Sequence, residues 1–267
     1  AEPIIAARNL VRVFGGGRTW YGTKKPELRA VDDVSLSVQP GTTLGIVGES
    51  GCGKSTLARM LTGLLPPTSG TIRLEGQPIT RLDRAAKSRF HPPVQLVFTD
   101  PSPSVNPRKT VRQILEGPRE AQTDLDHDAR RQRVAAVRVE VGLRPVCSHR
   151  YPHEFSGGQA QRIGIARALA VEPRLLVLDE PVSALDVSVQ AQVLRLFRDL
   201  QDRRGLTYLF ISHDLAVVEA LSSEVMVMLQ GQVAEAGPRD RVFRHPDHDY
   251  TRTLLAAVPV PGRRRSA

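Results

Sequence analysis

Short apolar runs alternate with amphipathic stretches along most of this chain. Residues 4–14 and 30–38 alternate apolar and polar positions as strands do, and residues 15–27 between them hold the glycines and lysines of a long surface connection. From residue 42 the order becomes strand, glycine-rich turn and helix. We expect that helix, residues 56–65, to end before Pro66. The pattern therefore predicts a β-rich opening followed by a first βα unit.

The second half of the chain predicts buried strands separated by helices. Residues 87–170 are rich in arginine, proline and helix formers, and their longest amphipathic stretch spans 126–143, which predicts a helical insert. Apolar runs of the length of strands follow at 174–181, 206–213 and 225–230. Residues 187–205 and 214–223 between them have helical periodicity. Because these strands are apolar throughout, we expect both of their faces to be buried.

Composition narrows the class of protein without choosing its ligand. The 267 residues include 37 Lys and Arg against 28 Asp and Glu, a formal charge of +9, and 40% are hydrophobic, which excludes a disordered or fibrous chain. No apolar run approaches the roughly 18 residues of a membrane span, and the first residues lack the pattern of a secretion signal, so we expect a cytoplasmic protein. Cys52 and Cys147 have no spacing that predicts a disulfide framework or a structural metal site. The positive charge would attract nucleotides, nucleic acid or an anionic membrane surface alike.

Residues 48–55, GESGCGKS, match the pattern G-x-x-x-x-G-K-[ST] completely, and they lie between an apolar strand and an amphipathic helix. Glycines let successive backbone N–H groups surround a phosphate, and the helix N-terminus adds its positive dipole end. Lys54 is expected to reach the β- and γ-phosphates, and Ser55 to ligate Mg²⁺. Cys52 would serve only as a small residue. The predicted phosphate-binding residues are Gly48, Glu49, Ser50, Gly51, Cys52, Gly53, Lys54, Ser55 and Thr56.

Two carboxylates follow the apolar strand that starts near residue 175. Asp179 stands where a Mg²⁺-bound water needs an acceptor, and Glu180, the next residue, is a candidate general base for an attacking water. Such a pair would usually be a solvated turn, but the phosphate-binding segment beside it favours the catalytic interpretation.

A third motif makes the combination specific. Residues 155–159, FSGGQ, lie between the phosphate-binding segment and LVLDEP at 176–181, and SALD at 183–186 and FISHD at 210–214 follow. With these motifs in this order, essentially the whole chain resembles the ATP-binding subunit of an ABC transporter. The resemblance implies an α/β fold: a P-loop NTPase core with an N-terminal antiparallel β-subdomain and a helical subdomain that carries the signature. We expect one ABC ATPase domain over 1–267, divided into 1–86 (β-subdomain and phosphate-loop core), 87–170 (helical subdomain with the signature), 171–237 (core with the carboxylates and His213) and 238–267 (C-terminal tail).

The resemblance also implies a Mg²⁺-dependent ATPase that closes as a dimer on two ATP molecules. The catalytic group would comprise Lys54, Glu180 and His213, and His213 would touch the γ-phosphate and the attacking water. Asp186 would organise the contact between the two sites. The residues expected to cap the γ-phosphate held by the opposite subunit are Ser156, Gly157, Gly158 and Gln159.

An aromatic side chain of the β-subdomain is expected to stack on adenine. Alignment of RNLVRVF with the family pattern indicates Phe14, with Trp20 and Tyr21 as alternatives. Phe14 is equally compatible with ordinary strand packing.

Thr99 is the main departure from the family, because relatives carry a glutamine there that reaches Mg²⁺ and senses the membrane subunits. Gln95 lies about 13 Å away along a strand and does not replace it. We expect Thr99 to reach the metal through a water, with weaker metal contact, looser coupling of hydrolysis to transport, and ATP binding retained. A smaller departure is Ala160, where relatives usually carry a basic residue.

Residues 100–116 and the tail HPDHDYTRTLLAAVP resemble the subfamily that imports di- and oligopeptides, nickel and related metal chelates, and peptide ranks slightly ahead. Relatives usually have proline where Asp249 stands. Two isolated cysteines do not supply an iron-sulfur cluster. His245, Asp247 and His248 favour tail packing over a metal site, and residues 263–265 favour a solvated tail.

The expected partners are a paralogous ATPase subunit or a second copy of this chain, two membrane permease subunits and an extracytoplasmic solute-binding protein. The expected location is the cytoplasmic face of the membrane, as a peripheral subunit. One alternative is a soluble ABC ATPase acting on DNA or ribosomes, but only about 100 residues separate Lys54 from Ser156, with no heptad repeat, so we expect no nucleic acid. Another is a regulatory cassette that hydrolyses ATP weakly, which Thr99 favours.

Overall fold

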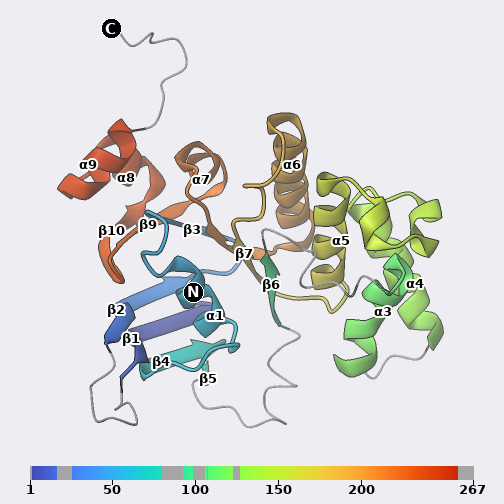
Figure 1. Cartoon of the computed structure of the whole chain (residues 1–267), viewed down its shortest axis with the longest axis horizontal. Coiled ribbons are helices and arrows are strands. Elements are labelled where there is room, and N and C mark those ends of the chain that lie inside the picture. Colours follow the sequence, from blue (N-terminus) through green and yellow to red (C-terminus); the bar gives the residue numbers. More distant parts are fainter. Residues whose placement is uncertain are drawn as a thin grey trace, which may run out of the picture.

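The computed structural model describes residues 2–16, 26–79, 93–98, 106, 108–122 and 127–257. Two sheets, separated by α1 and flanked by a group of helices, form the molecule (Figure 1). The smaller sheet is antiparallel, in the order β2-β1-β4-β5, and its strands are β1 (Ile5–Gly15), β2 (Glu27–Val38), β4 (Ser69–Leu74) and β5 (Gln77–Pro78). The α/β class and the N-terminal antiparallel β-subdomain are thus confirmed.

The larger sheet has the order β10-β9-β3-β8-β7-β6, and all neighbours pair in parallel except β9 with β10. Its strands are β3 (Thr43–Val47), β6 (Val94–Phe98), β7 (Leu175–Asp179), β8 (Thr207–Ile211), β9 (Glu224–Leu229) and β10 (Gln232–Pro238). Every residue of β3, β7 and β8 is buried. This confirms the expectation that such strands are covered on both faces.

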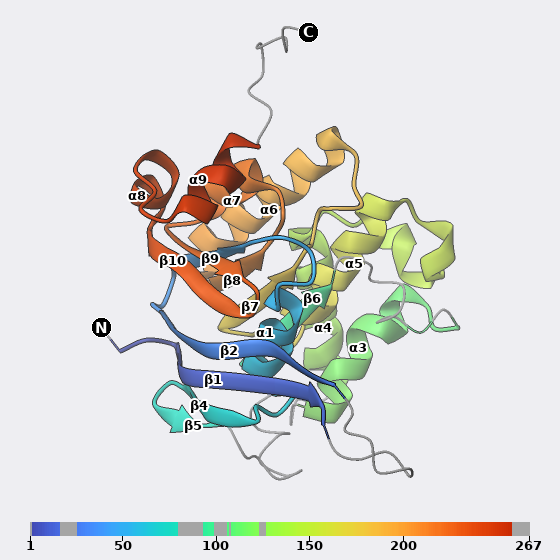
Figure 2. The same ribbon diagram turned by 60° about the vertical axis from the view of Figure 1, so that its left-hand side comes forward.

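Helices cover the two faces of the parallel sheet unequally (Figures 1 and 2). Helix α1 fills the space between the two sheets, and one hydrophobic cluster joins it to β1, β2 and β4. A second cluster on the opposite face joins the remaining helices. The helices are α1 (Lys54–Leu61), α3 (Val111–Gln122), α4 (His127–Glu140), α5 (Gly157–Leu169), α6 (Val187–Arg204), α7 (Leu215–Leu221), α8 (Arg239–Arg244) and α9 (Asp249–Ala256), with short 3₁₀ turns at Pro145–His149 and Pro152–Glu154.

Two predicted boundaries differ from the structure. The expected helix 56–65 starts at Lys54 and ends at Leu61, because Gly53 caps its N-terminus and Gly63, with a φ of 71°, takes the left-handed conformation that ends helices. The range expected for the helical insert, 87–170, includes β6. Because β6 pairs in parallel with β7, it belongs to the core sheet, and among the described residues the first helix of this part begins at Val111.

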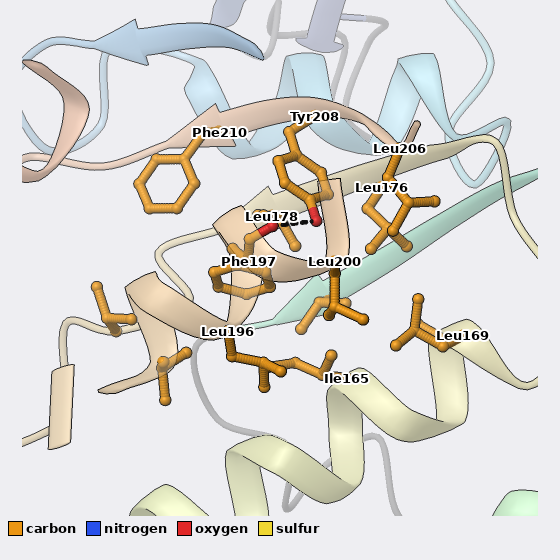
Figure 3. Packing of buried hydrophobic residues seen from close by; sticks show 14 of the residues in the cluster. Ile165, Leu169, Leu176, Leu178, Leu196, Phe197, Leu200, Leu206, Tyr208 and Phe210 are labelled. Carbon is orange, nitrogen blue, oxygen red and sulfur yellow. Dashed lines mark hydrogen bonds between the residues drawn. The ribbon is translucent and has the colours of Figure 1, made fainter. Parts of the chain in front are cut away.

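Aromatic rings hold α6 against the parallel sheet (Figure 3). Phe197 meets Tyr208 and Phe210 edge to face, with ring centroids 5.7 and 6.4 Å apart. The Tyr208 hydroxyl donates a hydrogen bond of 2.8 Å to the Phe197 carbonyl oxygen, so its polar atom is satisfied inside the core. Burial raises the pKa of this hydroxyl far above its usual value.

Truncating Phe197 should therefore leave a cavity under α6. Phe197→Ala is expected to lower the free energy of unfolding by about 3–5 kcal/mol. Val187→Ala on the same helix, where the side chain is 84% exposed, should change it by less than about 0.5 kcal/mol. Urea unfolding followed by circular dichroism measures both. Equal midpoints for the two variants would show that this cluster does not hold α6.

Candidate functional site

Parallel pairing brings three loops to one edge of the larger sheet. Strands β3, β8 and β7 are neighbours, with Ile46 opposite Ile211 and Ile211 opposite Asp179. The segments that follow these strands therefore start side by side, and they carry the glycine-rich loop, His213 and the two carboxylates. Ligands of open parallel sheets bind outside the carboxyl ends of their strands. The candidate site is at this edge.

The glycine-rich loop between β3 and α1 is packed too closely for side chains at some positions. Gly53 has a φ of 107°, and a Cβ added there would lie 2.1 Å from the Ala30 carbonyl oxygen of β2. A side chain at Gly53 would therefore push the loop away from the β-subdomain. The glycine places the N-terminus of α1 directly beneath the loop, where its backbone N–H groups face an incoming anion.

Lys54 has a buried ammonium group that is held by its own loop. The residue is 7% exposed, and Nζ donates hydrogen bonds of 2.7 Å to the Gly48 carbonyl oxygen and 2.8 Å to the Glu49 carbonyl oxygen. A buried charge needs such partners. The two carbonyls hold the cation over the concave side of the loop, where the predicted role of Lys54 requires it.

Ser55 and Asp179 meet across the site. The Ser55 hydroxyl donates a 3.0 Å hydrogen bond to Oδ1 of Asp179, and Asp179 is only 6% exposed. Burial raises the pKa of the Asp179 carboxyl, and the Ser55 hydrogen bond only partly opposes this. A hydroxyl and a carboxylate are the oxygen donors that Mg²⁺ accepts, and Mg²⁺ usually keeps several waters and takes phosphate oxygens as its other ligands. This pair fits the predicted metal position.

Glu180 and His213 form the second polar contact of the site. His213 Nδ1 lies 2.8 Å from Oε2 of Glu180, and because a carboxylate only accepts, the ring proton of this bond belongs on Nδ1. The Glu180 side chain is 20% exposed and that of His213 is 64% exposed. Glu180 has a φ of 55°, which is unusual for a residue other than glycine, and its amide donates to the Ile211 carbonyl oxygen. Such backbone strain recurs at functional sites.

A pocket of about 350 Å³ connects these groups with the β-subdomain. Its lining comprises Phe14, Leu28, Ala30, Ser50, Gly51, Gly53, Lys54, Ser55, Thr56, Glu180 and His213. Gly48, Glu49 and Cys52 of the predicted set do not line it. Gly48 and Cys52 are buried in the loop, and Cys52 Sγ lies 3.8 Å from Lys54 Nζ.

The β-subdomain contributes an apolar wall to this pocket. Phe14 of β1 is opposite Leu28 of β2 in the antiparallel pair, and these side chains are 37% and 65% exposed. The Arg12 guanidinium lies 4.8 Å from the centroid of the Phe14 ring. Leu28 and Ala30 were missed by the sequence analysis, because only the strand register shows that they face the same pocket. Trp20 and Tyr21 lie outside the described residues.

The signature residues are arranged at the start of α5. The Gln159 amide donates to Oγ of Ser156 (3.4 Å), and the Ser156 amide donates to Oε1 of Gln159 (3.2 Å), which together form a capping box. A Cβ added to Gly158 would lie 2.3 Å from a methyl group of Val189, so this glycine lets α5 approach α6. The described residues that line the pocket include none of the signature residues.

Asp186 ends the loop that begins with Glu180 after β7. It is the N-cap residue of α6, and its side chain makes no capping hydrogen bond. It is exposed, as is Val187 beside it. Thr99 lies outside the described residues. The preceding residue, Phe98, is bound to α5: Nε2 of the buried Gln161 donates a 3.3 Å hydrogen bond to the Phe98 carbonyl oxygen.

Helix α9, near the C-terminus, contacts the backbone of the glycine-rich loop. The Glu49 amide donates a 3.2 Å hydrogen bond to the hydroxyl of Tyr250 in α9. In the sequence, Tyr250 is one residue of the tail that resembles the importer subfamily, and the separation of 201 residues gives no signal of this contact. Asp247 pairs with Arg241, and Nδ1 of His248 accepts from the Tyr250 amide. Among the described residues no cluster of three or more potential ligands forms a metal site.

Comparison with known proteins agrees with this geometry. Residues 31–183 match the sequence profile of the ABC transporter family. The chain is 50% identical to a dipeptide transport ATP-binding protein of Escherichia coli over 97% of its own length and 77% of that protein. It is 48% identical to an oligopeptide transport ATP-binding protein of the same organism, over 92% of this chain and 74% of that protein.

Solved structures give the same fold. CbiO1 of Clostridium perfringens, part of an ABC transporter complex, superposes with a TM-score of 0.78 at 27% identity, covering 97% of each chain. A dimeric ATP-binding cassette bound to ADP and phosphate superposes with a TM-score of 0.77 at 24% identity, covering 88% of this chain and 98% of the other. In the part of the chain that the structure describes, no helix has the length and apolar character of a membrane span.

The buried Asp179 carboxylate should reduce the stability of the nucleotide-free protein at neutral pH. Because its pKa is raised in the fold, the stability that it contributes is present at low pH and is lost as the pH rises through that raised value. Asp179→Asn mimics the neutral carboxyl, so its melting temperature should exceed that of the wild type at pH 7.5, and the difference should shrink at pH 5.

Thermal unfolding without nucleotide or Mg²⁺ measures this effect. Asp186→Asn, which changes an exposed carboxylate, is the matched control and should leave the melting temperature unchanged at both pH values. A lower melting temperature for Asp179→Asn at pH 7.5 would contradict the assignment of a destabilising buried charge.

Proposed function

This chain belongs to the ABC transporter family, whose ATP-binding subunits are Mg²⁺-dependent ATPases, and on that premise we propose that it powers a di- or oligopeptide importer. One observation carries the proposal for its site. Glu180, His213, Lys54 and Ser55 line one pocket that has an apolar wall, and Asp179 is hydrogen-bonded to Ser55 behind that lining. That arrangement suits a nucleoside triphosphate, with the base on the wall and the phosphates on the loop.

Each polar group then has a distinct task in phosphoryl transfer. Lys54 would exchange its loop carbonyls for oxygens of the β- and γ-phosphates, and the N-terminal amides of α1 would bind the same anion. Ser55 and Asp179 would hold Mg²⁺, which supplies positive charge against the phosphates when bound. Phe14, with Leu28 opposite, would contact adenine.

Glu180 would take the proton of the attacking water. Its carboxylate is oriented by the hydrogen bond from His213 Nδ1, and Nε2 of the same ring, when it also carries a proton, would donate to the terminal phosphate. The strained backbone at Glu180, and the hydrogen bond that its amide donates to the Ile211 carbonyl oxygen, fix the position of the backbone from which the carboxylate extends. Catalysis is then mostly positioning and charge neutralisation.

The pocket of one subunit lacks the signature, which supports a composite site. Ser156, Gly157, Gly158 and Gln159 lie at the N-terminus of α5, where first-turn amides have no acceptor within the helix. In a dimer this end would cap the γ-phosphate held by the opposite subunit, and exposed Asp186 would lie at the contact between the two sites. The partner is a paralogous ATPase subunit or a second copy of this chain.

The assembly would include two membrane permease subunits and an extracytoplasmic solute-binding protein, and this chain would lie on the cytoplasmic face of the membrane. Peptides are the favoured cargo because the relatives described above are named for dipeptide and oligopeptide transport. Nickel or another metal chelate is the alternative. Purified transporter in vesicles, tested for uptake of labelled dipeptide against nickel chelate, decides between the two cargoes.

Glu180→Gln tests the catalytic assignment. Without its base, the subunit should bind ATP but hydrolyse it at least about 100-fold more slowly, and a closed, ATP-bound dimer should accumulate. ATPase assays and size-exclusion chromatography with light scattering, with the partner subunit present, measure both results.

Glu219→Gln in α7 is a matched control, because it makes the same chemical change on an exposed helix and should leave turnover unchanged. Turnover by Glu180→Gln within threefold of the wild type would exclude Glu180 as the general base.

Thr99→Gln tests whether the departure at this position weakens hydrolysis. The longer amide should contact the metal and the water directly, so we expect a higher ATPase rate and a lower Mg²⁺ requirement, with little change in ATP affinity. Steady-state rates across a Mg²⁺ titration provide the measurement. If both variant and wild type show the same rate and the same Mg²⁺ midpoint, Thr99 does not limit this enzyme.

A further inference from the structure

The peptide unit that joins Gly48 to Glu49 is held at both of its polar ends. Its carbonyl oxygen, that of Gly48, accepts from Lys54 Nζ (2.7 Å), and the next carbonyl oxygen, that of Glu49, accepts from Lys54 Nζ (2.8 Å) and from the Cys52 amide (3.3 Å). Its N–H, that of Glu49, donates to the hydroxyl of Tyr250 (3.2 Å). The Glu49 side chain is exposed and does not line the nucleotide pocket, so the residue belongs to the loop through its backbone alone.

Tyr250 reaches the loop from a fixed support. Its ring is partly buried against the hydrophobic cluster on the outer face of the parallel sheet, together with Leu254 and Leu255 of α9. Burial raises the pKa of its hydroxyl, so the group is a neutral phenol at neutral pH, and its oxygen accepts from the Glu49 amide. Helix α9 lies beside β10 and α8, at the end of the sheet where the chain's C-terminal part gathers (Figures 1 and 2).

Glu235 of β10 holds the start of α9. Its side chain is 7% exposed, and its carboxylate accepts the amides of Asp247 (2.9 Å) and His248 (3.1 Å). Burial alone would raise the pKa of this carboxyl, but hydrogen bonds from the Asp247 amide, the Thr251 side chain and the His248 amide together outweigh burial, and the pKa lies below its ordinary value. Glu235 is therefore ionised at neutral pH, and it fixes the turn from which Tyr250 projects.

We propose that Tyr250 is a positioning residue for ATP binding, and that α9 holds the phosphate-binding loop open through the Glu49 amide. The inference rests on the proposed function of the loop. In the nucleotide-free protein, Lys54 and Tyr250 hold opposite sides of the same peptide. When Lys54 turns toward phosphates, it gives up bonds to the loop carbonyls, and the Tyr250 hydrogen bond then keeps Glu49 in place.

This arrangement links nucleotide affinity to the C-terminal part of the chain. Helix α9 lies beyond residues 31–183, the part that matches the family profile. A change that moves α9 would release the Glu49 amide. The loop would then lose conformational entropy when ATP binds, which weakens binding. The expected effect is on ATP affinity rather than on the chemical step, because Tyr250 does not line the pocket.

Tyr250→Phe keeps the ring and removes only the hydroxyl. We expect the Kd for ATP, from equilibrium titration of the full chain with a fluorescent ATP analogue, to rise about 2- to 10-fold, the equivalent of one hydrogen bond. The turnover number should stay within about twofold. Hydrogen exchange with mass spectrometry on the nucleotide-free protein should show faster exchange at the Glu49 amide. Tyr151→Phe, which removes a hydroxyl from a tyrosine far from the loop in sequence, should change none of the three.

Glu235→Gln extends the test to the support, since it removes the charge that holds the start of α9 and leaves the Tyr250 hydroxyl itself unmutated. It should raise the same Kd and quicken the same amide. Unchanged affinity and unchanged Glu49 exchange in Tyr250→Phe would overturn the proposal, and unchanged values in Glu235→Gln alone would overturn the role of Glu235. If the wild type itself fails to bind ATP, the proposed function fails instead.

Discussion

The parallel pairing of β3, β8 and β7 is the constraint on which the site depends. No two of its loops are close in sequence, and they meet only because Ile46, Ile211 and Asp179 occupy adjacent register positions at the ends of three buried strands. A slip of one residue in this register would turn every side chain of the strand to the other face. These strands are buried along their whole length, so such a slip would lose core contacts on both faces, and the packing of the core also sets the geometry of the site.

The same edge of the sheet carries features that do not favour stability. An ammonium group and a carboxylate are buried there, and Glu180 has a backbone conformation that costs free energy. The surrounding core compensates for these costs: α6 is held by a cluster of rings, and α1 is enclosed between two sheets. In the described part of the chain, Lys54 Nζ forms no salt bridge and donates to loop carbonyls, which carry no net charge, so the nucleotide-free site is preorganised for an anion. This explains why a phosphate-binding loop needs so much rigid structure around it.

Much of this arrangement could be predicted from the sequence, because local signals determine it. The segment 48–55 between a strand and a helix, and the acids after the strand at 175–179, place the centre of the site by position alone. The sequence could not show that Leu28 faces Phe14 or that Tyr250 reaches Glu49, since both depend on register or on contacts between distant segments. Strands β4 and β10 and helix α8 were also missed, because most of their residues are exposed or only partly buried and their apolar periodicity is therefore weak. The boundary at residue 87 was wrong for a related reason, as β6 belongs to the core sheet only through its pairing with β7.

The central claim is that one subunit holds the nucleotide and another completes its pocket. The chain holds both halves of such a site, the loop around Lys54 and the capped N-terminus of α5, and the pocket that it forms alone contains only the first half. A structure of the assembled importer trapped with ATP tests this most directly. The account predicts that the Ser156 hydroxyl lies within hydrogen-bond distance of the terminal phosphate of a nucleotide held by the other ATPase subunit. A trapped assembly in which Ser156 faces solvent, or only the nucleotide of its own chain, would contradict it.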